Sequence, residues 1–180
     1  MWFFRGAVVK NIQLPQITKD RLLDLKVGEV EYIIVPIIGI TIKNFSILDV
    51  DEFILYWSPL KKGQSFYIGE EFADAHKNKI RYSFNKVYYR DDCPYKEAIW
   101  RPADQMQPHQ SRFYGECLSV IVTDLDHCVM DTRKQLYGNT SDEFFRYYKD
   151  LVLQHNKLHN TNIPPSMDDY VLLGKVRRDK

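Results

Sequence analysis

The chain has 180 residues, enough for one domain with a sizeable core, and 44% of them are apolar while 27% are charged. Its abundant aromatic residues exclude an intrinsically disordered chain, and its net charge of +1 gives no overall basic surface for nucleic acid. The charge is nevertheless uneven. The segment from Phe72 to Arg101 holds seven Lys or Arg residues and four Asp or Glu residues.

Three features predict a soluble cytoplasmic protein with no membrane partner. The three cysteines are odd in number and widely spaced, which favours free thiols over a disulfide framework. The first residues lack the apolar region of a signal peptide, because Arg5 and Lys10 interrupt them. The longest apolar run, YIIVPIIGITI, has 11 residues and contains Pro36, so it is too short to cross a bilayer.

The first third of the chain is predicted to contain strands and one short helix. Thr18 is a candidate N-cap for a helix that ends near Gly28. Pro59 and Gly63 indicate a turn. Apolar runs and alternating apolar residues predict strands at 2–10, 29–35, 40–48 and 51–57.

The rest of the chain predicts further strands and three helices. A short helix is expected from Gly69 to Asn78, and residues 91–111, with three prolines, are expected to form a long irregular connection. Further helices are expected at 125–137 and 141–159. Strands are predicted at 79–84, 86–90, 112–123 and 170–176.

Two segments fifty residues apart resemble each other, LLDLKVGEVEYII (22–34) and FADAHKNKIRYSF (72–84). Gly28 aligns with Asn78, and both residue types tolerate the left-handed conformation that ends a helix. The shared unit would be a short helix, a cap and a strand, repeated near 18–35 and 69–84. A chance match stays equally open, because secure repeats show stronger identity.

The stretch VIVTDLDHCVMDT resembles the first motif of haloacid-dehalogenase-type phosphatases. The resemblance implies that Asp124 attacks phosphorus, that Asp126 protonates the leaving group, and that magnesium binds beside them. Two positions depart from that pattern, since His127 replaces glycine and Cys128 replaces threonine. Only 56 residues follow Asp124, although the family has several more parallel strands there.

A helix start explains the same residues without chemistry, and we favour this interpretation. Thr123 or Asp124 would cap a helix from Leu125 to Tyr137, and Asp126 would lie in its first turn, where the helix dipole favours negative charge. We therefore expect no catalytic residue and no cofactor.

His155 and His159 lie four residues apart and would share one face of the last helix. Zinc would need two more ligands from elsewhere, and no metalloprotease motif is present because Asn156 follows the first histidine. Histidines near a helix C-terminus are also favoured by the helix dipole, so we expect no metal site.

The segment KIRYSFNKVYYR interleaves basic and aromatic residues on a predicted strand. This pattern suits an acidic protein partner, because Tyr and Arg contribute strongly to protein interfaces. It also suits single-stranded nucleic acid, which stacks on aromatic rings. The candidate binding residues are Lys79, Arg81, Lys86, Tyr88, Tyr89 and Arg90.

Three stretches near the N-terminus, RLLDLKVGEVEYIIVPI, NFSILDVDEF and EEFADAHKNKIRYSF, resemble immunity proteins of bacterial polymorphic toxins. They lie between Arg21 and Phe84. The resemblance implies a small cytoplasmic protein that neutralises a toxin by binding it and has no chemistry of its own.

Together these patterns predict a single α+β domain over residues 1–180, with a mostly antiparallel sheet covered by the two C-terminal helices in the part 124–160. The leading function is a non-enzymatic, protein-binding inhibitor, such as an immunity protein. The alternatives are a magnesium-dependent phosphatase at Asp124 and Asp126 and a nucleic-acid-binding accessory protein.

Overall fold

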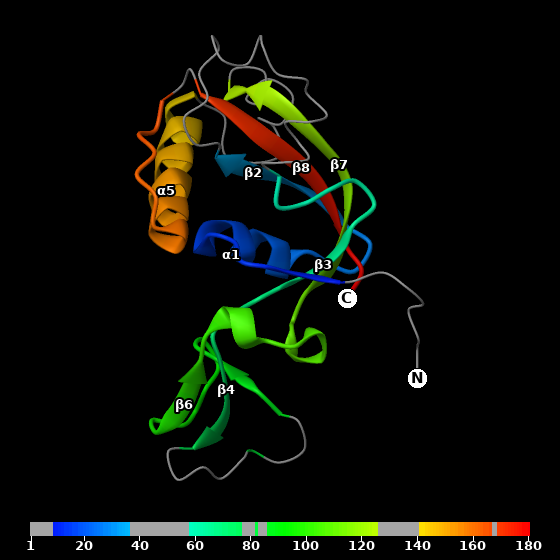
Figure 1. Cartoon of the computed structure of the whole chain (residues 1–180), viewed down its shortest axis with the longest axis vertical. Helices are drawn as coiled ribbons and strands as arrows, with labels where there is room; N and C mark the ends of the chain where they lie inside the picture. The colour runs from blue at the N-terminus through cyan, green and yellow to red at the C-terminus, as the bar shows by residue number, and fades with distance from the viewer. Residues whose placement is uncertain (1–8, 37–57, 77–81, 83–85, 126–140, 167–168) are drawn as a thin grey trace.

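The computed structural model describes residues 9–36, 58–76, 82, 86–125, 141–166 and 169–180. They form a large lobe and a small lobe that projects from one end of it (Figure 1). The elements are β1 (Lys10–Ile12), α1 (Gln16–Asp24), β2 (Val30–Pro36), β3 (Ser65–Ile68), β4 (Phe72–His76), β5 (Tyr88–Tyr89), β6 (Ala98–Arg101), the short 3₁₀ turns η1 (Ala103–Gln105) and η2 (Pro108–Gln110), β7 (Tyr114–Asp124), α5 (Ser141–His159) and β8 (Tyr170–Arg178).

The large lobe is built on a five-stranded sheet with the strand order β1-β3-β7-β8-β2. The pair β1 and β3 is parallel, and the other three neighbouring pairs are antiparallel. The longest pairing joins β7 to β8, and its register shifts between Cys117 and Ser119. This arrangement confirms the predicted α+β class and its mostly antiparallel sheet.

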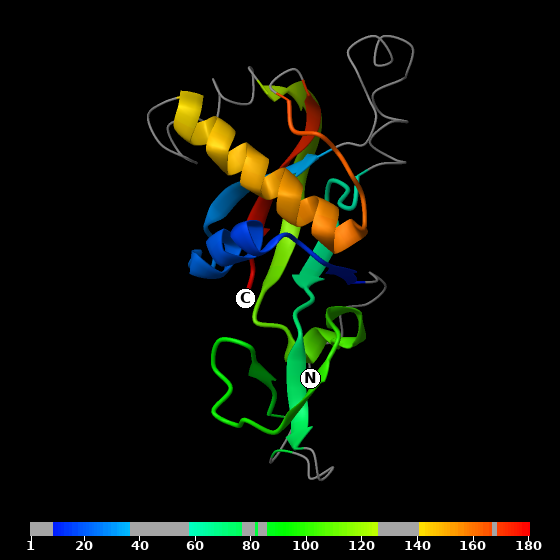
Figure 2. The ribbon, with the colours of Figure 1, turned by 90° about the vertical axis from the view of Figure 1, so that its left-hand side faces the viewer.

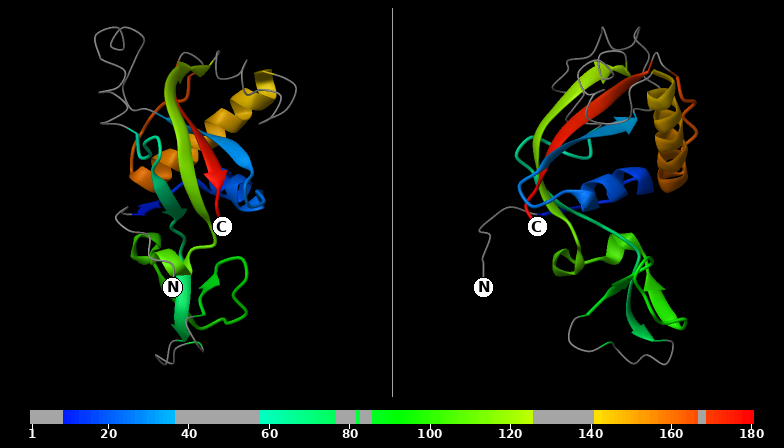
Figure 3. Two further views of the ribbon diagram at one scale, coloured as in Figure 1. Left: turned by 90° about the vertical axis from the view of Figure 1, so that its right-hand side faces the viewer. Right: turned by 180° about the vertical axis from the view of Figure 1, so that it is seen from behind.

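Two helices cover this sheet, and both lie in front of the strands in Figure 2. The view from the opposite side in Figure 3 shows the strands in front of α5. Of the two helices, α5 matches the helix predicted at 141–159. The other is α1, near the N-terminus, so the prediction of two C-terminal helices is confirmed only in part. The predicted helix at 125–137 lies outside the described residues, Leu125 excepted.

The core of the large lobe consists of two buried clusters. In the first, Phe144, Tyr148, Leu151 and Val152 of α5 pack against apolar residues of β2 and β8. Their spacing of three or four residues places them on one face of the helix, as the sequence pattern requires. This packing fixes the position of the C-terminal turn of α5, which borders the cleft described below.

The second cluster joins α1 to the other end of the sheet. Leu22 of α1 packs with residues of β1, β3, β7 and β8. The neighbours Ile33 and Ile34 of β2 belong to different clusters. Because successive residues of a strand point to opposite faces, β2 is buried on both faces at this point although it lies at the edge of the sheet.

The small lobe contains an antiparallel sheet of three strands in the order β5-β4-β6. It is anchored by a third buried cluster with the members Tyr67, Phe72, Tyr89 and Met106. Tyr67 belongs to β3 of the large lobe, so this cluster lies at the junction between the lobes. The Tyr67 hydroxyl donates a hydrogen bond of 2.9 Å to the Met106 carbonyl oxygen.

The helix predicted from Gly69 to Asn78 was wrong, since Phe72–His76 form strand β4. This strand is central in its sheet, with β5 on one side and β6 on the other. The buried Phe72 and Ala73 are therefore held by pairing on both sides, which overrides the local helical preference. The similar segments 22–34 and 72–84 thus differ in secondary structure where both are described.

Two further predictions need correction. The connection 91–111 is not irregular throughout, because it contains β6 and the turns η1 and η2. Thr18 does not cap α1, which begins at Gln16 after Pro15. The Pro15 carbonyl oxygen accepts the N–H groups of Thr18 and Lys19, each at 3.0 Å.

The strands predicted around 29–35, 112–123 and 170–176 are confirmed as β2, β7 and β8. The predicted turn is also present, with Gly63 at a φ of +80°. The strand predicted at 2–10 is described only at its end, where Lys10 begins β1. The strands predicted at 40–48, 51–57 and 79–84 lie outside the described residues, Tyr82 excepted. No described helix combines the length and apolar character needed to cross a membrane.

Candidate functional site

The acidic pair of the phosphatase resemblance is only partly described. Asp124 is the last residue of β7 and is paired with Tyr170 of β8. The two strands that pair with β7, namely β3 and β8, are antiparallel to it, whereas the resemblance implies a parallel sheet. Asp126 lies outside the described residues, so its role as an acid or in a helix turn stays a prediction.

The two histidines of α5 lie together, with ring centroids of His155 and His159 4.4 Å apart. Burial lowers the pKa of His155 to about 4, and the neighbouring His159 adds to this effect. Burial also lowers the pKa of His159. Within the part of the chain that the structure describes, no group of three or more His, Cys, Asp or Glu residues is arranged to hold a metal ion.

The predicted basic and aromatic surface is divided by the structure. Lys79 and Arg81 lie outside the described residues. Around β5, Lys86 and Arg90 are exposed, whereas Tyr89 is only 9% exposed. The residues predicted to form one surface therefore have different roles.

The first of these roles belongs to a cluster of tyrosine rings in the small lobe. Tyr82 and Tyr95 are stacked with centroids 4.9 Å apart and planes 17° apart. Tyr88 meets both rings edge-on, at 5.0 and 5.4 Å. The Lys86 ammonium lies 4.9 Å from the centroid of Tyr88. With Tyr95 40% exposed, the cluster offers an ordered aromatic surface beside a cation.

Arg90 stacks on a different ring. Its guanidinium carbon lies 4.0 Å from the centroid of Trp100 in β6, and its Nε donates to the Glu71 carboxylate at 2.8 Å. Nearby, Arg101 is paired with Asp74 at 2.8 Å. Arg90 is thus held by Trp100 and Glu71, and Arg101 is held by Asp74 of β4.

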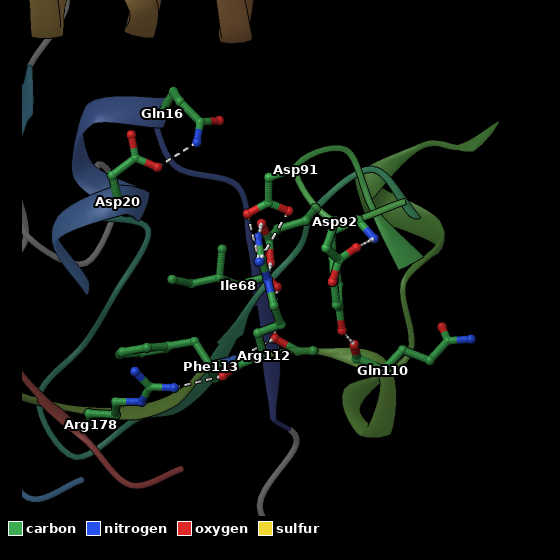
Figure 4. A network of polar contacts seen from close by, with 12 residues as sticks. Gln16, Asp20, Ile68, Asp91, Asp92, Gln110, Arg112, Phe113 and Arg178 are labelled. Atoms are coloured by element: carbon green, nitrogen blue, oxygen red, sulfur yellow. Dashed lines mark hydrogen bonds and ion pairs between the residues drawn. The ribbon is translucent and has the colours of Figure 1, made fainter. Parts of the chain in front are cut away.

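Tyr89 instead packs against Arg112, the centre of a partly buried polar network in which Figure 4 shows the contact between Arg112 and Asp91. The Arg112 guanidinium donates to both carboxylate oxygens of Glu70, at 2.6 and 3.0 Å, and to Asp91 at 2.9 and 3.2 Å. It also lies 4.2 Å from the centroid of the Tyr89 ring, whose hydroxyl donates to the carbonyl oxygen of Gln110. The sequence alone did not indicate this network.

The electrostatics of the network follow from burial and charge. The side chain of Glu70 is only 7% exposed, and the Arg112 guanidinium beside it compensates its negative charge. Hydrogen bonds from Arg112 hold the pKa of Asp91 below its usual value. Burial, reinforced by Glu70, raises the pKa of Tyr89 to about 12, so this phenol stays protonated at neutral pH.

Two cavities lie near these residues. One, of about 380 Å³, is in the small lobe beside Tyr82, Arg101 and the turn η2. The other, of about 730 Å³, is a cleft between the lobes. It is lined by the segment before α1, the first turns of α1, the link 69–71, the turn after β5, Arg112 and the last turns of α5.

No family model matches the chain, and no curated protein or solved structure matches it.

Proposed function

We propose that this chain is a cytoplasmic, non-enzymatic inhibitor that binds another protein, as an immunity protein binds its toxin. The observation that carries the proposal is the tyrosine cluster of Tyr82, Tyr88 and Tyr95, which lies with Lys86 on the projecting small lobe. The resemblance of the stretches between Arg21 and Phe84 to immunity proteins supports the same function.

The tyrosine cluster has the properties of a protein-binding surface. Interface energy concentrates in tyrosine, tryptophan and arginine side chains that are already ordered before binding. Here each ring of the cluster is held by the other two, and Arg90 is fixed on Trp100. These side chains are therefore already largely ordered before the protein binds a partner.

The charge of the same region indicates an acidic partner. The sequence from Ala75 to Arg90 contains five Lys or Arg residues and no Asp or Glu. Such a segment accelerates the encounter with a partner of opposite charge, and salt weakens that effect.

The product of the neighbouring gene is the partner to test, because immunity proteins are encoded beside their toxins. We expect the two purified proteins to form a stable complex in calorimetry, and the variant Tyr88→Ala/Tyr95→Ala to bind at least about 30-fold more weakly, as for a hot spot. Leu153→Ala is the control, because this leucine is 59% exposed on α5, outside the small lobe. Equal affinity of the tyrosine variant and the wild type would exclude this surface.

Two other measurements address the alternative functions. Phosphate release from an aryl phosphate that Asp124→Asn abolishes would replace the proposal with the phosphatase. Retention of a single-stranded oligonucleotide in a gel shift, lost as salt is raised, would replace it with nucleic-acid binding.

A further inference from the structure

The cleft between the lobes is lined by charged, polar and aliphatic side chains. At about 730 Å³ it falls within the range of ligand-binding cavities in proteins. The large lobe contributes the start of α1 and the C-terminal turns of α5, and the small lobe contributes the turn after β5. A ligand in this cleft would therefore contact both lobes at once.

Every acidic side chain that lines the cleft already has a hydrogen-bonding partner. Glu70 and Asp91 are bound by Arg112, and Glu71 is bound by Arg90. Asp20 accepts a hydrogen bond of 2.6 Å from Gln16, as Figure 4 shows. These carboxylates are thus satisfied without a ligand, and so are the two arginines.

The two described lysines that line the cleft differ from the acidic side chains in their contacts. Neither Lys19 of α1 nor Lys157 of α5 forms an ion pair with a described residue, although both line the cleft. The pKa of Asp91 is lowered mainly by its hydrogen bond from Arg112, and the charge of Lys19 makes a smaller contribution in the same direction. Beside Lys157, Leu158 is 38% exposed. Among the described residues that line the cleft, the charged groups without an ion pair are therefore these two ammonium groups, and an aliphatic side chain follows one of them in the sequence.

From this arrangement we infer that the cleft binds a short acidic segment of the protein partner, whose carboxylates pair with Lys19 and Lys157 and whose aliphatic side chains contact Leu158. The inference rests on the proposed function and assigns a second contact surface to it. Salt bridges of this kind across an interface contribute to specificity and to the association rate.

A peptide fits the lining better than a nucleic acid does. Among the described residues, no aromatic side chain lines the cleft, so bases would have no ring there on which to stack. The amide of Gln13 can exchange hydrogen bonds with a peptide backbone, and Gln154, whose Oε1 already accepts the Ile17 N–H at 2.9 Å, can donate from its Nε2.

The test uses a fluorescein-labelled octapeptide of alternating Glu and Leu residues and measures its binding to the full chain by fluorescence anisotropy. We expect saturable binding that weakens with salt, and about tenfold weaker binding by the variant Lys19→Gln/Lys157→Gln. The matched control is Lys61→Gln/Lys62→Gln, which removes two exposed lysines outside the cleft and leaves the affinity unchanged. A peptide of alternating Gln and Leu should not bind.

Equal affinity of the wild type and the Lys19→Gln/Lys157→Gln variant overturns the inference, and so does the absence of saturable peptide binding. A labelled oligothymidylate that binds the cleft more tightly than the acidic peptide also overturns it, in favour of nucleic acid. The proposed function is judged separately. The proposed function stands if the Tyr88→Ala/Tyr95→Ala variant no longer binds the partner protein while the Lys19→Gln/Lys157→Gln variant still binds it. If the acidic peptide binds the cleft but the neighbouring protein does not bind the chain, the proposed function fails and the peptide-binding site remains.

Discussion

At the scale of single residues, the neighbours Tyr88 and Tyr89 show how a two-residue strand divides its side chains. Because successive side chains point to opposite faces, Tyr88 joins the exposed tyrosine cluster and Tyr89 enters the buried network around Arg112. The sequence placed both in one predicted binding surface. Only Tyr88 can contact a partner directly, and Tyr89 holds Arg112 in place behind it.

The residue His155 makes the stability of the protein depend on pH. An unfolded histidine binds a proton near pH 6.5, whereas burial lowers the pKa of His155 in the folded protein to about 4. Protonation therefore favours the unfolded chain, and stability should fall as the pH decreases from about 6.5 to about 4, by at most about 3 kcal/mol.

Urea unfolding at several pH values measures this effect. The variant His155→Leu should have a flatter dependence in that range, because it removes the histidine whose pKa burial lowers to about 4. The control His109→Gln changes an exposed histidine and should keep the wild-type dependence. A His155→Leu profile parallel to that of the wild type would contradict the prediction.

At the scale of elements, α5 is the clearest case in which an apolar pattern determines both a helix and its orientation. It begins with the acidic Asp142 and Glu143 and ends with the basic Lys157 and His159, as the helix dipole favours. Its apolar stripe packs on β2 and β8, so the helix cannot rotate without exposing it.

Two leucines of α5 provide a matched pair for testing this orientation. Leu151 is fully buried, whereas Leu153, two residues later, is 59% exposed. Leu151→Ala should lower the free energy of unfolding by about 2–5 kcal/mol, because it leaves a cavity in the core. Leu153→Ala should change it by less than about 0.5 kcal/mol. Chemical denaturation of both variants gives the comparison, and similar losses would show that the helix is oriented differently.

At the scale of the whole molecule, the junction between the lobes is narrow and closely packed. The Asn11 side chain of β1 donates to the carbonyl oxygen of Ala103 at 3.1 Å. Gly69 donates to the Ile12 carbonyl oxygen at 3.0 Å, and a Cβ at this position would lie 2.3 Å from the Asn11 amide oxygen. These contacts, with the third apolar cluster, set the position of the small lobe and hence the width of the cleft.

Arg112 stabilises this junction from the other side. Its variant Arg112→Ala leaves Glu70 buried without a counter-charge, so the free energy of unfolding should fall by about 3 kcal/mol. Arg177→Ala is the control, because Arg177 is 38% exposed and its pairs with Glu116 and Asp179 lie at the surface. It should cost less than about 1 kcal/mol. If thermal or urea unfolding showed equal losses of stability for the two variants, the burial of Glu70 would not explain the effect of Arg112→Ala.

Some of this structure could be derived from the sequence because the signal is local. The apolar positions of α5 repeat every three or four residues, and β7 and β8 are rich in β-branched and other apolar residues. Such patterns need no knowledge of the rest of the chain. The segment FADAH was predicted wrongly because its short local signal is weaker than the pairing that β5 and β6 impose on it.

By itself, the sequence determined the α+β class, the ends of the main strands to within a few residues, and the basic and aromatic character of the segment around Tyr88. Only the tertiary structure decided the strand order, the division into two lobes, the network around Arg112 and the cleft. Arg112 contacts Glu70 and Asp91, which lie 42 and 21 residues away in the chain. Contacts at such separations leave no periodic trace in the sequence, because they depend on how the completed elements pack.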